Sequence, residues 1–451
     1  MDDKDAAVRP EAGSSDEPAP RTPSQPATGM SQDASAVRPR HFGGFDGLRA
    51  IAAVSVVLVH TAFDSGFTFT SSLGAYTSRL EIGVSIFFLI SGFLLYRPFA
   101  VSHLSGRSAP NTRRFWERRL LRIVPAYWLA LTLLTYVFHL VKMGPGFANV
   151  VVHYFFMQIY FNWSFSYGIS QAWSLCTEMS FYLVLPAFAA LVVARRKGSS
   201  NQLVRELIAV AAVYFLSCWF RWWYTNQSFW TASHGHLQPV CYPHCTSHVP
   251  GWLVTNLWLP AQMDLFALGM LLAVLSAWWT EHDSEPKWLS ARWMPWVSWL
   301  GAVLAFWAVS HLGIPTQFEL LPLRTTSMEQ HGLYGIFALL LLLPAVFGPE
   351  DRSLIRRFLR CWPMASLGVV SYGIYLWHIG ALDQFMSWTG YVLFEVPFWI
   401  LSLGTLALSI VVASISYFAL EKPVLRLKDR LGWWNRPIGP TAEAEAEVLA
   451  K

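Results

Sequence analysis

Residues 45–63 read FDGLRAIAAVSVVLVHTAF, an apolar run that carries Arg49 near its start and His60 near its end. A helix needs about 20 mostly apolar residues to cross the hydrocarbon core of a bilayer. This run therefore predicts a membrane-spanning helix over 47–65. Ionisable side chains inside a membrane are costly and usually mark a pathway or a site, so Arg49 and His60 are the first candidates for function.

The rest of the chain repeats this apolar pattern. Hydrophobic residues make up 54% of the 451 residues and charged residues only 14%. Soluble proteins carry roughly 25% charged residues, so this composition excludes a soluble enzyme. The pattern predicts an all-α polytopic membrane protein with about ten transmembrane helices. The further runs lie at 81–97, 120–141, 173–194, 206–223, 257–279, 294–312, 333–348, 366–387 and 395–419, and the shorter aromatic stretch 150–161 predicts an interfacial or re-entrant segment.

The positive charges predict the orientation in the membrane. Of the 33 Lys and Arg, only Arg79, Lys142, Arg221 and Arg324 fall in external segments when the N-terminus is placed in the cytoplasm. The positive-inside rule then predicts that both termini are cytoplasmic. We also expect this multi-pass protein to lie in the plasma membrane. The formal net charge of +5 is too small to imply a nucleic-acid partner.

Both ends of the chain are predicted to be tails. Residues 1–40 hold many Pro, Ser and Ala and almost no large apolar residues, which is typical of a disordered segment. They contain no apolar run followed by a cleavage site, so they are not a signal peptide. We therefore expect a disordered cytoplasmic tail over 1–40, a transmembrane domain over 41–430 and a cytoplasmic tail over 431–451.

Arg49 and His60 are eleven residues apart, which places them about 20° from the same helix face and roughly 16 Å apart along the axis. Arg49 would lie at the cytoplasmic edge, and His60 would face the same cavity from the outer half. Glu178, in WSLCTEMSFYLVLP (173–186), enters from the external side to a similar depth. A Glu–His pair is an acid/base arrangement, so His60 and Glu178 are the predicted catalytic residues. A snorkelling Arg, a carbonyl-bonded His and a structural ion pair are the alternatives.

Arginines cluster in RRFWERRLLRIVPAYW (113–128), where Arg119 and Arg122 share one face of the helix. Arginine forks hold phosphates through paired hydrogen bonds, so these two residues are candidates for binding a pyrophosphate-bearing ligand. The alternative is that they act with Arg113, Arg114 and Arg118 only as a topology signal and as contacts for lipid headgroups.

Four further residues are candidates for lining a cavity: Ser91, Trp173, Tyr375 and His378. Ser91 stands next to Gly92, and such small residues also serve close helix packing. Asp264 and Glu421 are weaker candidates. In the external loop 224–256, Cys241 and Cys245 are compatible with a disulfide, with free thiols or with a zinc site among nearby histidines. Their spacing matches no standard zinc motif, so we assign no metal site.

Five motifs together resemble the acyltransferase family 3 membrane proteins. They are FDGLRAIAAVSVVLVH (45–60), GVSIFFLISGFLL (83–95), RRLLRIVPAYW (118–128), WSLCTEMSFYLVLP (173–186) and SYGIYLWH (371–378), and they follow the family's order over residues 43 to about 425. The resemblance implies that Arg49 and His60 are essential, that Arg119 and Arg122 form the family's basic pair and that Glu178 serves the reaction centre. The sequence ends soon after the tenth predicted helix, so it is similar to stand-alone members without a fused C-terminal hydrolase-like domain.

These observations predict a membrane O-acyltransferase. We expect it to move an acyl group, with acetyl the first expectation, from acyl-CoA to a hydroxyl of a carbohydrate-containing acceptor, which would be a surface polysaccharide, a glycolipid or a macrolide-like metabolite. Acyl-CoA would be a co-substrate, and no tightly bound cofactor is expected. Arg49, Arg119 and Arg122 would hold the CoA phosphates. The alternative is a transporter or a non-enzymatic binder that uses the same buried His, Glu and Arg residues.

Overall fold

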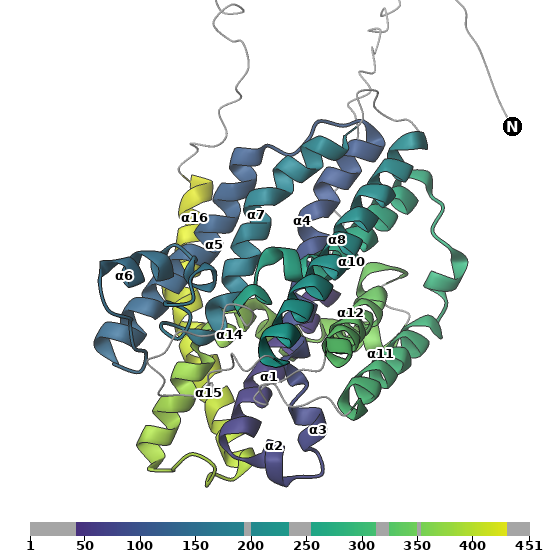
Figure 1. Ribbon diagram of the computed structural model, residues 1–451. Helices are drawn as coiled ribbons and strands as arrows, with labels where there is room; N and C mark the ends of the chain where they lie inside the picture. Colours follow the sequence, from purple (N-terminus) through teal and green to yellow (C-terminus); the bar gives the residue numbers. More distant parts are fainter. Residues whose placement is uncertain (1–41, 194–199, 234–253, 313–323, 350–352, 431–451) are drawn as a thin grey trace, which may run out of the picture. The chain divides into compact units, whose positions relative to one another are not determined.

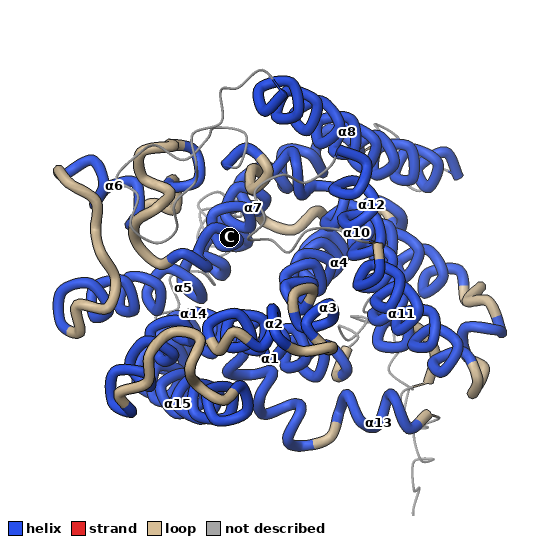
Figure 2. Tube along the Cα trace, turned by 60° about the horizontal axis from the view of Figure 1, so that its bottom comes forward, coloured by secondary structure: helices blue, strands red, loops and turns tan. Residues whose placement is uncertain are grey.

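The computed structural model describes residues 42–193, 200–233, 254–312, 324–349 and 353–430, and these described residues form one compact unit. All regular structure in these ranges is helical (Figure 2). Nine of the helical segments have the length and hydropathy to cross a membrane. The described part of the chain is therefore an all-α multi-pass membrane protein, as predicted.

The helices follow one another along the chain in the order drawn in Figure 1. Their bounds are α1 Gly44–Asp64, α2 Phe67–Thr70, α3 Gly74–Thr77, α4 Gly83–Ser105, α5 Thr112–Thr132, α6 Phe147–Tyr154, α7 Trp173–Val192, α8 Ser200–Ser233, α10 Leu259–His282, α11 Met294–His311, α12 Arg324–Val346, α13 Leu354–Arg360, α14 Trp362–Thr389, α15 Phe398–Ser416 and α16 Lys422–Arg430. Two π-helical segments, Leu133–Val137 and Tyr417–Glu421, continue α5 and α15.

Each of the ten predicted spans corresponds to a helix, and nine of them are the spans that meet the length and hydropathy criteria. The remaining predicted span, 294–312, corresponds to α11. This helix is 18 residues long, and its Pro, Trp and terminal His residues lower its mean hydropathy. It packs against α12 and exposes large apolar side chains on its other side, among them Leu300, Val303 and Trp307. This exposed apolar side is what a helix in contact with lipid presents.

Four helices form the centre of the bundle: α1, α4, α10 and α14. α4 packs chiefly on α10, and α1 packs on α14 and α4. In α10, 72% of the apolar window is buried, against 17% in α8, so α8 is a peripheral helix whose apolar side chains face outward. The first turn of α5 is capped by Asn111, whose side chain accepts a hydrogen bond from the Arg114 backbone N–H at 3.0 Å.

Two glycines allow α4 and α10 to approach closely. A Cβ on Gly92 would lie 2.2 Å from the Phe266 carbonyl oxygen, and one on Gly269 would lie 2.1 Å from the Leu89 carbonyl oxygen. Each glycine therefore accommodates the backbone of the opposite helix, as small residues do where membrane helices pack closely. The packing role considered for the Ser91–Gly92 pair is thus fulfilled by Gly92.

The aromatic stretch 150–161 forms no spanning helix, as predicted. It lies in the short α6 and in the 3₁₀ turn Gln158–Tyr160. Two hydrogen bonds fasten it to α5: Tyr127 donates to the His153 carbonyl at 3.0 Å, and the Trp128 indole donates to the Tyr154 carbonyl at 2.8 Å. The two predicted tails, Cys241 and Cys245 lie outside the described residues.

Candidate functional site

The structure brings the three predicted ligand-binding arginines together from two helices. Arg49 lies on α1 and donates to Asp46 at 3.0 Å. Arg119 and Arg122 lie on α5, and their charges act on the Arg49 guanidinium. All three are half-buried, whereas Arg118 on the same helix is exposed. A basic cluster drawn from segments 70 residues apart is thus assembled inside the bundle, as the sequence predicts.

The guanidinium groups of Arg119 and Arg122 are uncommitted. Neither forms a hydrogen bond or an ion pair with any residue that the structure describes. Arg356 shows the opposite case, because it is buried and donates to four carbonyl oxygens of the protein, including those of Pro344 and Phe347. An arginine whose N–H donors are already bonded to backbone carbonyls stabilises the fold and has few donors left for a ligand. Arg119 and Arg122 retain donors for a ligand, and their planar forks suit phosphate.

Glu178 belongs to the arginine side of this site. Its Oε1 atom accepts hydrogen bonds from Ser91 of α4, at 2.5 Å, and from Tyr182 of α7. Its charge also acts on Arg119. The sequence predicts a pair of Glu178 with His60 because the two lie at a similar depth, but no hydrogen bond joins them within the described residues. The hydrogen-bond partners of Glu178 there are Ser91 and Tyr182, and its catalytic function stays a prediction.

His60 faces another histidine instead. Its ring centroid lies 5.2 Å from that of His378 on α14, with the ring planes at 41°. His378 is fully buried, and its Nδ1 atom lies 2.7 Å from the Tyr375 carbonyl oxygen. Its Nε2 atom is buried and has no hydrogen-bond partner among the described residues. The side chain of His60 likewise forms no hydrogen bond within the described part of the chain.

A row of polar side chains on α14 leads from the arginine cluster to the two histidines. Tyr372 donates to the carbonyl of Ile123, the residue after Arg122, at 2.9 Å. Tyr375 and His378 follow at steps of three residues. Six residues of α-helix rise about 9 Å, so this row extends about that far along the bundle.

The remaining predicted residues are also placed around this row. Tyr375 donates to the Gln171 carbonyl at 2.8 Å and lies 2.6 Å from the Ser174 hydroxyl, so it fastens α14 to the start of α7. Trp173 packs edge-on against Phe88 of α4 with ring centroids 6.1 Å apart. These two residues position the helices around the site.

The match to known families agrees with this geometry. A family model described as an acyltransferase domain matches residues 42–418, which is most of the chain. The chain belongs to acyltransferase family 3. The resemblance inferred from the five motifs is thereby confirmed. No solved structure gives a significant match to this family 3 chain.

Three curated relatives of this family 3 chain differ in how much of it they cover. O-acetyltransferase OatA of Staphylococcus aureus is 24% identical over 407 residues, which are 86% of this chain and 57% of that protein. Peptidoglycan O-acetyltransferase OatA of Listeria monocytogenes is 28% identical over 162 residues, 33% of this chain and 24% of that protein. Nodulation protein 10 of Rhizobium leguminosarum bv. viciae is 25% identical over 418 residues, 87% and 95% of the two chains. The chain thus spans just over half the length of the staphylococcal OatA.

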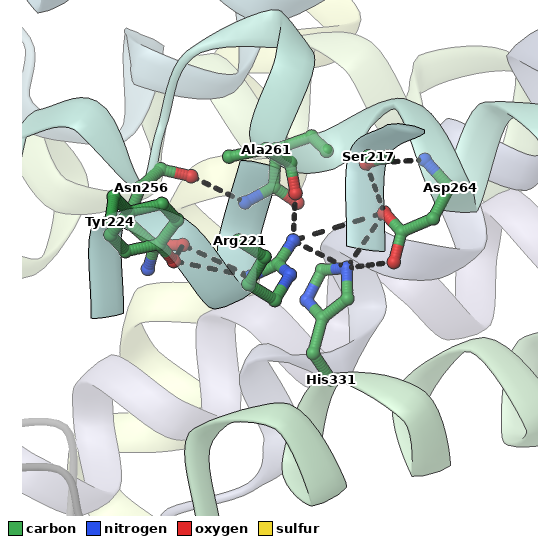
Figure 3. Close-up of polar contacts among 8 residues, drawn as sticks. Ser217, Arg221, Tyr224, Asn256, Ala261, Asp264 and His331 are labelled. Carbon is green, nitrogen blue, oxygen red and sulfur yellow. Dashed lines mark hydrogen bonds and ion pairs between the residues drawn. The ribbon is translucent and has the colours of Figure 1, made fainter. Parts of the chain in front are cut away.

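The family 3 chain contains a second buried polar cluster, on α8, α10 and α12 (Figure 3). His331 Nε2 lies 2.7 Å from Arg221 Nη2 and 2.9 Å from Asp264 Oδ2. Arg221 also donates to the Ala261 carbonyl, and Ser217 donates to Asp264 at 3.3 Å. Because Arg221 and Asp264 are bonded to neighbouring protein groups, this cluster joins three helices and is a poor candidate for a ligand site. The weak functional prediction for Asp264 therefore gains no support.

Sequence reasoning missed one contact of the family 3 site and gave little weight to a further residue. The missed contact is that between His60 and His378, which depends on the packing of α1 against α14. The further residue is Glu421, a weaker candidate in the sequence, which lies buried in the π-helical segment Tyr417–Glu421 and whose charge interacts with that of Arg122. A π-helical insertion is a frequent feature of functional sites, but apolar periodicity does not reveal it.

Proposed function

We propose that this chain is an O-acyltransferase of the plasma membrane, with both termini in the cytoplasm. It transfers an acyl group, acetyl in the first instance, from acyl-CoA to a hydroxyl of a carbohydrate-containing acceptor. Family membership supports the reaction class. The observation that carries the donor assignment is the pair of half-buried arginines, Arg119 and Arg122, whose guanidinium donors are uncommitted beside Arg49.

The arginine cluster is proposed to hold the phosphates of acyl-CoA. Three guanidinium groups present many donors in fixed forks, which match the oxygens of a pyrophosphate. Glu178 and Glu421 lie near enough for their charges to act on Arg119 and Arg122, yet neither forms an ion pair with them. The two glutamates therefore orient the arginine side chains, and the guanidinium N–H groups stay available to the ligand. The polar row on α14 would then guide the thioester toward His60.

His60 is the proposed general base. It would take the proton of the acceptor hydroxyl as the oxygen attacks the thioester carbonyl, and a tetrahedral intermediate would form. Collapse of that intermediate breaks the C–S bond, and the imidazolium returns the proton to the departing thiolate. The products are the ester and free CoA. Positioned general acid–base catalysis of this kind contributes about 10²–10⁴-fold to the rate.

The printed names of the relatives support the choice of a carbohydrate acceptor. One is called a peptidoglycan O-acetyltransferase, and peptidoglycan is a polymer of amino sugars with free hydroxyl groups. We extend that acceptor class to this chain. Comparing the glycans, glycolipids and secreted metabolites of a deletion strain by mass spectrometry would identify the acceptor, because the missing acyl group gives a defined mass difference.

Thioester turnover tests the proposal. Purified protein in lipid nanodiscs should release CoA from acetyl-CoA and transfer radiolabelled acetyl to soluble oligosaccharides, beginning with N-acetylglucosamine oligomers. The same protein in proteoliposomes should show no gradient-dependent flux of the sugar. Flux without release of CoA would overturn the proposal in favour of a transporter, and binding without either would indicate a non-enzymatic binder.

A further inference from the structure

The hydrogen bonding of His378 fixes which of its nitrogens carries a proton. A carbonyl oxygen only accepts, so the 2.7 Å contact with the Tyr375 carbonyl requires a hydrogen on Nδ1. In the neutral ring, Nε2 then carries a lone pair and is an acceptor. This Nε2 is buried and has no partner among the described residues. Buried polar atoms in native proteins nearly always have a partner, so this orphan nitrogen requires an explanation.

The ring of His60 lies beside that of His378, on the neighbouring helix. The two rings lie 5.2 Å apart between centroids, and α1 and α14 pack directly on each other. His60 is free of hydrogen bonds to the described residues, so its ring can adjust when a substrate arrives. His378 cannot adjust in the same way, because it is fully buried and tied to its own helix. One histidine is therefore fixed and the other is adaptable.

We propose that His378 is the positioning residue for His60, in the place that sequence reasoning gave to Glu178. This inference rests on the proposed function. In the neutral ring of His60, one nitrogen takes the proton of the acceptor hydroxyl and the other carries an N–H. With substrate bound, that other N–H turns toward Nε2 of His378 and donates to it, which fixes the tautomer and stabilises the imidazolium that forms. As the C–S bond breaks, the proton that His60 took from the acceptor passes to the thiolate, and His60 is again neutral.

This arrangement specifies the function of each nitrogen of His378. Nδ1 anchors the ring to the helix, and Nε2 serves the reaction. Asn can reproduce a donor near Nδ1, and Gln can place an acceptor near Nε2. Comparing His378→Asn with His378→Gln therefore separates the anchoring function from the function in the reaction. The matched control is His282→Asn, because His282 has the same kind of Nδ1 contact to a carbonyl of its own helix but lies at the exposed end of α10.

The test measures steady-state acetyl transfer from acetyl-CoA to N-acetylglucosamine oligomers, per folded molecule. We expect His378→Asn to lower kcat by about 10²-fold, and His378→Gln to keep about tenfold more activity than Asn. KM for acetyl-CoA should stay unchanged in both, and His282→Asn should match the wild type. The double variant His60→Asn/His378→Asn should be no slower than His60→Asn alone, because the two residues act as a unit.

A second measurement tests the inference even if the substitutions destabilise the protein. Added imidazole should restore part of the rate to His378→Gly and should leave its thermal unfolding unchanged. Full activity in His378→Asn, or a rise in acceptor KM with unchanged kcat, would overturn the inference while leaving the proposed function intact. A wild-type protein that releases no CoA would instead overturn the proposed function itself.

Discussion

Arg118 and Arg119 are adjacent in the sequence but have different environments. Arg118 is exposed, whereas Arg119 is half-buried and interacts electrostatically with Glu178 and Arg122. The sequence predicts this distinction through helical spacing, because residues 119 and 122 share a face. It could not predict that the guanidinium donors of both stay uncommitted, since that depends on what α1, α7 and the π-helical segment Tyr417–Glu421 place around them.

The basic pair gives the first prediction at this scale. Arg122→Ala should raise KM for acyl-CoA about tenfold or more, because a hydrogen-bonded charge contact to phosphate is worth about 1.5–3 kcal/mol. The protein should remain folded, since the guanidinium makes no described bond within the protein. Arg118→Ala is the matched control and should have an unchanged KM. Acyl-CoA binding can be measured by titration. Equal effects of Arg122→Ala and Arg118→Ala on it would show that Arg119 and Arg122 serve only as a topology signal.

At the scale of elements, apolar runs predicted the ten long helices because each must satisfy its backbone hydrogen bonds inside lipid. The apolar runs predicted the central part of each helix but not the residues at which it begins and ends. α8 begins and ends beyond its apolar run, and α12 begins well before its run, since a helix can continue past the membrane surface. The contacts that join helices were less visible, because they depend on which faces meet. Gly92 and Gly269 are an example, as their reciprocal approach joins two spans far apart in the sequence.

The glycine contact gives a prediction of its own. Gly269→Val should destabilise the protein by about 1–3 kcal/mol or more, because its side chain would overlap the Leu89 carbonyl and force α4 away from α10. Gly332→Ala should leave stability unchanged or slightly raised, since a Cβ there meets nothing within 4 Å. Thermal unfolding in detergent measures both. Equal melting temperatures for the two variants would show that the helices do not approach this closely.

The Arg221–Asp264–His331 cluster gives a second prediction at this scale (Figure 3). Asp264→Asn keeps the shape of the side chain but leaves the buried Arg221 charge without its counter-ion. Breaking a buried pair in this way costs about 3–5 kcal/mol, so the melting temperature should fall. Turnover per folded molecule should stay near that of the wild type, because the cluster is separate from the proposed site. Unchanged stability with lost turnover would give the cluster a catalytic function.

At the scale of the whole molecule, the sequence predicted the fold class, the ten long helices and the convergence of Arg49 with Arg119 and Arg122. It paired Glu178 with His60 by depth, whereas the described hydrogen bonds of Glu178 go to Ser91 and Tyr182, because depth along a helix does not say which neighbour a side chain meets. His378 was predicted only as a lining residue. Its contact with His60 depends on α1 packing against α14, and that pairing of helices becomes known only from the folded chain.

The most direct measurement is acyl transfer per folded molecule by His60→Asn. Asn retains hydrogen-bonding capacity but cannot act as the base. We predict that its turnover falls by about 10²–10⁴-fold, while membrane insertion, melting temperature and acyl-CoA binding stay near those of the wild type. Turnover near that of the wild type in correctly folded His60→Asn would contradict the proposed chemistry.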